Sequence, residues 1–210
     1  MGLLGRLFGA RRAGRPVLDR GPPPAALSAG AESFHARPPS FSLVFFEGDV
    51  REAIPSLLAG CGYRLTGGVS ERVVAADLYG SMQRWSGRGR LVVRKAVYPV
   101  PGFTVLADPE LVVTTDDEAL EDFCRANRIG AIAALWERVS KTVLLHEVGP
   151  DGSRRRSFWT EGRPEAGQAP HPELAARPDA DGLQAALARL GIPLRSVWGE
   201  VEATVLELEP

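Results

Sequence analysis

The chain has 210 residues, 44% of them hydrophobic, which is enough for one sizeable core or two small ones. A formal net charge of -1 provides no bulk field that would attract nucleic acid, so the charge balance argues against a dedicated DNA-binding protein. The two cysteines, Cys61 and Cys124, lie in apolar segments and lack the spacing of a metal site or a disulfide framework. This usage is typical of buried thiols in a reducing compartment.

The N-terminal sequence does not fit a targeting signal. Its arginines follow or interrupt the apolar residues, whereas a secretory signal places positive charge before a longer apolar run. Arg11 and Arg12 precede a proline-rich stretch instead of the apolar region of a twin-arginine signal. No segment approaches the roughly 20 apolar residues of a membrane-spanning helix. We therefore expect a cytoplasmic protein, and the near absence of lysine, which occurs only at Lys95 and Lys141, favours a GC-rich bacterial source.

Residues 1–40 are rich in Gly, Pro, Ala and Arg, with six arginines against two acidic residues. This composition has little to bury and its prolines remove backbone donors, so we expect a disordered arm. If the start of the arm is helical, its apolar side chains form one stripe that two arginines follow. The residues concerned are Leu3, Leu4, Leu7, Phe8, Arg11 and Arg12. They are candidates for docking to a partner or a membrane surface, and a plain flexible tail is the favoured alternative.

The first elements after the arm are a strand and two helices. A run of β-favouring residues begins at Phe41. A helix is expected over 50–62, with Pro55 in its first turn, where proline is tolerated. A second helix is expected over 70–85 with Ser70 as its N-cap, because apolar residues recur behind it at helical spacing. These residues are Val74, Leu78, Met82 and Trp85.

Three short β-rich runs follow, at 91–99, 103–108 and 111–115, and connections this short join antiparallel neighbours. Thr115 and Glu118 form a capping box that opens the next helix. Its first turns hold an acidic cluster, namely Asp116, Asp117, Glu118, Glu121 and Asp122. No His or Asn accompanies the cluster at ligand spacing, so the helix dipole explains it better than a metal site does.

The stretch from Gly130 to Val148 predicts a hairpin. Both faces of its first strand are apolar as far as Leu135, which predicts an interior strand. If Lys141 centres the turn, Trp136 lies opposite His146. A basic strand, a helix and a last strand complete the chain, at 154–162, 181–191 and 196–209.

Strands and helices are mixed without a regular βαβ alternation. The pattern predicts an α+β fold, with a mixed, largely antiparallel sheet flanked by three or four helices and a disordered N-terminal arm. Residues 41–210 are expected to form a single domain, with subdomains at about 41–90 and 91–210 as the alternative.

Motifs that carry chemistry are missing from the sequence. It has no nucleophile elbow, phosphate loop, dinucleotide motif or paired-histidine zinc motif, so no catalytic residue, metal or cofactor is predicted. Trp136, Glu137, Arg138 and His146 are the candidates for a pocket. Packing at a sheet end is the favoured interpretation of the Trp136 and His146 pair, because an aromatic and an imidazole without a carboxylate are not a catalytic set.

The basic strand is the other candidate surface. Arg154, Arg155 and Arg156, followed by Phe158 and Trp159, give arginines and aromatics on alternating faces. Such a strand suits phosphate, RNA or an acidic protein surface. A solvated edge strand, whose charges discourage aggregation, is the favoured interpretation.

The leading hypothesis is a non-catalytic bacterial cytoplasmic protein that binds another protein, as an adaptor, regulatory subunit or immunity-type inhibitor. One alternative is an enzyme or small-ligand sensor that uses the pocket candidates. Another is a peripheral membrane protein attached through the arm. Nucleic acid is not expected as a partner, and the sequence leaves open whether a small-molecule ligand exists.

Overall fold

The computed structural model describes residues 40–75, 83–85, 91–165 and 170–210. Its strands are β1 (Phe41–Glu47), β2 (Arg64–Val74), β3 (Gln83–Trp85), β4 (Leu91–Val100), β5 (Phe103–Ala107), β6 (Ala131–Glu137), β7 (Thr142–Val148), β8 (Arg154–Thr160), β9 (Arg163–Pro164) and β10 (Glu200–Glu209). Its helices are α1 (Ile54–Gly60), α2 (Val112–Thr115), α3 (Asp117–Asn127), α4 (Pro172–Ala176), α5 (Ala180–Arg189) and α6 (Leu194–Trp198).

All pairings between the described strands are antiparallel. They join ten strands into one sheet in the order β2-β10-β4-β5-β1-β6-β7-β8-β9, and β3 also pairs with β4. This confirms the predicted α+β fold with a largely antiparallel sheet. Six helices occur in the described ranges instead of three or four, because α2, α4 and α6 occupy segments that the sequence predicts as loop or strand. None of these helices is both long and apolar enough to cross a membrane.

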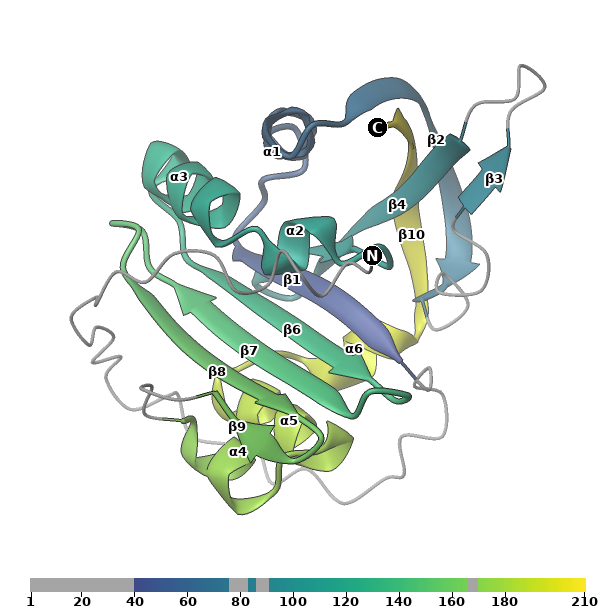
Figure 1. The fold of residues 1–210 in the computed structure, drawn as a ribbon. Helices are drawn as coiled ribbons and strands as arrows, with labels where there is room; N and C mark the ends of the chain where they lie inside the picture. Colours follow the sequence, from purple (N-terminus) through teal and green to yellow (C-terminus); the bar gives the residue numbers. More distant parts are fainter. Residues whose placement is uncertain (1–39, 76–82, 86–90, 166–169) are drawn as a thin grey trace.

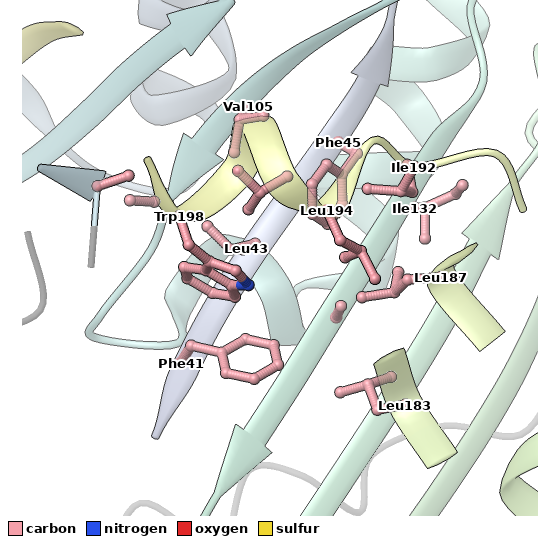
Figure 2. Packing of buried hydrophobic residues seen from close by; sticks show 14 of the residues in the cluster. Phe41, Leu43, Phe45, Val105, Ile132, Leu183, Leu187, Ile192, Leu194 and Trp198 are labelled. Atoms are coloured by element: carbon pink, nitrogen blue, oxygen red, sulfur yellow. The ribbon is translucent and has the colours of Figure 1, made fainter. Parts of the chain in front are cut away.

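Helices lie on both faces of the sheet (Figure 1). Residues of α1, α2 and α3 pack on one face around Phe46 and Leu106. Residues of α4, α5 and α6 pack on the other face, where Phe45, Leu187 and Trp198 belong to one hydrophobic cluster (Figure 2). Because the central strands are covered on both sides, β1 and β6 are continuous apolar runs. The interior strand predicted from Gly130 onwards is thereby confirmed.

Strands from both halves of the chain share this sheet. β1 pairs with β5 and with β6, and β2 pairs with β10 along its whole length. Residues 41–74 are therefore bonded to strands that come from 91–148 and from 200–209. The predicted disordered arm lies outside the described residues, apart from Ser40, whose hydroxyl accepts a hydrogen bond from the amide of Arg138 at 3.0 Å.

The helix predicted over 70–85 is wrong. Residues 64–74 form β2, Ser70 lies in the middle of that strand opposite Thr204, and Trp85 belongs to β3. Leu78 and Met82 lie outside the described residues. The apolar spacing fits a helix, but the β-branched residues of this segment favour an extended chain, and the long strand β10 pairs with β2 from Arg64 to Val74 with one register shift.

The strand predicted over 111–115 is also wrong, because these residues fold into α2. Leu111 has a positive φ of 64°, which turns the chain back on itself. The carboxylate of Asp108 then accepts from the backbone amide and the hydroxyl of Thr114, at 2.7 and 2.9 Å. A side-chain acceptor six residues upstream therefore decides the conformation over local β propensity.

The cap of α3 lies one residue later than the capping box predicts. Asp116 accepts a hydrogen bond from the amide of Ala119 at 3.0 Å, whereas the hydroxyl of Thr115 donates to the carbonyl of Leu111. Thr115 is already used by the last turn of α2, so Asp116 takes over the N-cap position.

Candidate interaction edge

The β6–β7 hairpin separates the four residues predicted to share a pocket. Trp136 pairs with Val143, and His146 lies opposite Ala133, so the expected pairing of Trp136 with His146 is wrong. Trp136 packs on the α4–α6 face, whereas His146 lies on the opposite face beside α3. The turn spans residues 138–141 and is not centred on Lys141, because Glu137 already pairs with Thr142.

Glu137 holds this turn together. Its carboxylate accepts from the amides of Val139 and Ser140, at 2.9 and 2.6 Å, and from the hydroxyl of Ser140 at 2.6 Å. Partial burial by itself would raise the pKa of Glu137, but these hydrogen bonds outweigh it and lower the pKa. The neighbouring Arg138 is exposed. Glu137 therefore acts on its own backbone and does not face a cavity shared with Arg138.

Replacing Glu137 by alanine should lower the free energy of unfolding by about 1–2 kcal/mol, because a charged acceptor of several local donors is lost. Arg138→Ala, one residue along, should change it by less than about 0.5 kcal/mol. Urea denaturation of both variants measures the difference. Equal effects of the two changes would contradict this assignment of Glu137 to the turn.

The acidic start of α3 meets the basic strand β8. Asp117 Oδ2 lies 3.1 Å from Nη1 of Arg156 and 3.6 Å from Nη1 of Arg154, and Glu121 accepts from Arg154 at 2.6 Å. The acidic cluster and the arginine run, which are separate in the sequence, thus neutralise each other on one face of the sheet. His146 lies beneath them, with its Nδ1 3.3 Å from Asp117 Oδ1.

His146 is completely buried, and neither of its ring nitrogens has a hydrogen-bond partner among the residues that the structure describes. Burial is the main cause that lowers its pKa to about 4, with Arg156 and Arg154 acting in the same direction and Asp117 opposing them. The imidazole is therefore neutral at neutral pH and closed off from solvent, which makes it a packed core histidine.

The two remaining basic-strand candidates face the other side of the sheet. Arg155 lies 3.9 Å from Glu147 and donates to the carbonyl of Pro170 at 3.4 Å. Trp159 is buried in the core beneath α4 and α5. Most of the basic strand is therefore occupied by contacts within the chain. Arg154 and Arg156 bind α3, and Arg155 binds the segment before α4.

A buried charge cluster lies on the α1–α3 face, and sequence reasoning missed it. Lys95 donates from a fully buried position to Asp108 and, at 2.8 Å, to Glu110, with its ammonium 5.0 Å from the ring centre of Tyr63. The available signal was the scarcity of lysine: one of only two lysines among 25 basic residues lies inside an apolar strand. The ammonium is fully buried, and both of its hydrogen bonds and its ring contact are made within the protein, so the cluster is closed to solvent.

A cavity of about 450 Å³ opens between α1 and α3. Leu57 and Phe123 contribute to its wall, and the acidic side chains of Asp116, Glu118 and Asp122 line it as well. None of the residues predicted to bind a ligand lines this cavity. The docking candidates of the arm, from Leu3 to Arg12, lie outside the described residues, so that part of the prediction stays a prediction.

The open surface of the fold is the edge strand β2, at one rim of the sheet (Figure 1). β2 pairs with β10 on one side, and no described strand pairs with its other side. Three of the four large hydrophobic side chains that are exposed in the described ranges belong to it. They are Leu65, Val69 and Val74, with Val69 exposed to 60%. A long, exposed and partly apolar edge is a template for another strand.

Alternate residues of β2 direct their backbone groups to this open side. The amide of Ala75, just after the strand, donates to the carbonyl of Gly199 at 2.9 Å, and Val74 pairs with Glu200. Hydrogen-bonded and non-hydrogen-bonded pairs alternate in an antiparallel ladder. The backbone groups of Glu71 and Val69 therefore point to β10. Those of Gly68, Ser70, Arg72 and Val74 point away from it.

The chain matches no protein-family model, no curated protein and no solved structure. A proposal for its function must therefore rest on its own surfaces. The rim formed by β8 and β9 is less open than β2, because β9 pairs with Trp159 and Thr160 and arginines flank the rest. The clusters around His146 and Lys95 are closed, so β2 is the feature best suited to a partner.

Proposed function

We propose that the protein is a non-catalytic protein-binding module, acting as an adaptor, regulatory subunit or immunity-type inhibitor, that captures an extended segment of a partner along β2. The open side of β2 carries the proposal. Backbone donors and acceptors at Gly68, Ser70 and Arg72 would bond to the main chain of the added strand, which is the recognition mode called β-augmentation.

Side chains of β2 would supply the specificity. Val69 stands on one face of the strand, beside Val205 of β10, and Glu71 on the same face is held by Arg94 at 3.1 Å. Gly67 and Gly68 leave room for larger partner side chains on either face. The surface therefore favours an extended peptide with an apolar residue opposite Val69 and a basic or neutral residue near Glu71.

Random peptides displayed on phage, selected on the intact protein, provide the probe for a test. Selected peptides should slow amide exchange at Gly68 and Ser70, which are the donors on the open side. Ser70→Pro should weaken their binding by at least about tenfold, since it removes an outward donor at an edge position where proline is tolerated.

Ser70→Ala is the matched control, because it keeps the amide and should bind the peptides as the parent does. Peptides that bind equally well to Ser70→Pro, or that protect amides elsewhere, would refute capture along β2. Failure to select any peptide that binds would count against the proposed function as a whole.

A further inference from the structure

We propose that β2 also pairs with the β2 of a second copy of this chain, in an antiparallel register centred on Val69. The free protein would then be a two-fold symmetric dimer whose partner-binding edges cover each other. This inference rests on the proposed function in one respect, that the edge of β2 accepts a strand. It goes further by naming the strand that occupies the edge when no partner is present.

Symmetry restricts the registers that two copies of β2 can adopt. In an antiparallel pair, hydrogen-bonded and non-hydrogen-bonded rows alternate, so a residue whose backbone groups point outward must pair with another such residue. When a two-fold axis relates the two strands, one residue therefore lies opposite its own copy. Val69 is the middle residue of β2, which runs from Arg64 to Val74. Centring on Val69 therefore overlaps the two strands along their length, with regular pairing from Gly67 to Glu71 and the register shift near Thr66 at each end.

The charges of β2 favour the same register. With Val69 at the centre, Glu71 lies opposite Gly67 of the second copy and Ser70 lies opposite Gly68. No like charges face each other, and the most exposed apolar side chain of the strand is covered by its own copy.

The other symmetric registers are less favourable. Centring on Glu71 or on Arg72 sets two like charges directly opposite each other, and centring on Gly68 places Val69 opposite Gly67, so that Val69 is not covered by its own copy. Centring on Ser70 places Val69 against Glu71, whose carboxylate is already held by Arg94. Only the register centred on Val69, among these symmetric registers, covers Val69 with an apolar side chain and keeps like charges apart.

The backbone of β2 fits this register as well. Gly68 and Ser70, whose backbone groups point to the open side, would lie opposite Ser70 and Gly68 of the second copy and exchange hydrogen bonds. Val69 directs its own backbone groups to β10, so the two copies of Val69 would form a non-hydrogen-bonded pair, the row in which side chains approach most closely. The formal net charge of -1 opposes the approach of two copies only weakly.

A cysteine scan of the intact protein tests the register. In the proposed dimer the two Cα atoms of residue 69 are about 4.5 Å apart, within disulfide range, whereas those of residue 71 are offset by about 13 Å along the strands. Val69→Cys should therefore form a disulfide-linked dimer on mild oxidation, and Glu71→Cys should not. Burial raises the pKa of Cys61 and of Cys124 to about 12, so the parent protein should stay uncross-linked.

Sedimentation velocity provides a second measurement that needs no new cysteine. The parent and Ser70→Ala should sediment as dimers, and Ser70→Pro as a monomer with unchanged circular dichroism. A parent protein that is monomeric at every concentration, or cross-linking at Ser70→Cys or Glu71→Cys instead of Val69→Cys, would overturn the proposed dimer. A monomer whose selected peptides still protect Gly68 and Ser70 would overturn the dimer alone and leave the proposed function standing.

Discussion

Replacing Lys95 by methionine should lower the free energy of unfolding by about 3–5 kcal/mol, a large share of the stability of a domain of this size. The ammonium of Lys95 is fully buried between Asp108 and Glu110. Methionine has a similar length but no charge, so the change leaves two carboxylates without their cation. Chemical denaturation at neutral pH measures the loss.

The reason lies in how a buried charge is kept ionised. Burial alone would lower the pKa of Lys95, but its attraction to Asp108 and Glu110 outweighs burial and raises the pKa. The carboxylate of Asp108 also accepts from the amide and the hydroxyl of Thr114, so it anchors α2 to β5. Loss of the ammonium therefore disturbs the cluster and the short helix that depends on it.

Lys141 provides the matched control, because it is the other lysine of the chain and lies exposed in the β6–β7 turn. Lys141→Met should change the free energy of unfolding by less than about 0.5 kcal/mol. Adding Asp108→Asn to Lys95→Met should recover part of the loss, since it removes one of the unpaired charges. If Lys95→Met were as mild as Lys141→Met, the cluster would contribute little to the fold.

Local sequence patterns are sufficient to predict the elements whose packing partners are close in the sequence. The hairpin from Gly130 to Val148 combines two apolar runs with a polar turn, and its first strand is interior as the sequence predicts. α5 follows the same logic, with Asp179 as its cap and Leu183 and Leu187 on its buried face. In these segments propensity, periodicity and the final packing agree.

Distant partners decide the elements that the sequence does not predict. Apolar spacing predicts a helix over 70–85, but residues 64–74 form β2 because residues 200–209 lie alongside them, more than a hundred positions later. In the same way Leu111 to Thr115 would make a strand by propensity, and the carboxylate of Asp108 folds them into α2. Such choices depend on tertiary contacts that no local window contains.

The candidate site could be predicted only in part for the same reason. The sequence presents an acidic cluster and an arginine run as separate surfaces, and only the pairing order shows that Asp117 contacts Arg156 across the sheet face. An open edge is harder still to predict, because it is defined by which strand lacks a second neighbour. The strand order therefore explains why Val69 on the edge strand is the candidate for binding, and why the arginines of β8 are not.

The pH dependence of stability should carry a contribution from His146. Its pKa is about 4 in the folded protein, below the ordinary value of 6.5, so the unfolded chain binds a proton that the folded chain does not bind between these values. This contribution is complete above pH 6.5, decreases as the pH falls and is lost near pH 4. Over that window it amounts to about 3 kcal/mol.

His146→Leu removes the titrating group while keeping an apolar side chain of similar size in the same place. Urea denaturation at pH 7 and at pH 4.5 should show a smaller loss of stability for this variant than for the parent. The other ionisable groups are the same in both proteins, so the difference between the two pH profiles isolates the imidazole. A parallel His171→Leu variant measures the contribution of the second histidine, whose pKa is also lowered by burial. Identical profiles for His146→Leu and the parent would mean that the imidazole binds its proton equally well in the folded and the unfolded chain, which contradicts the lowered pKa of His146.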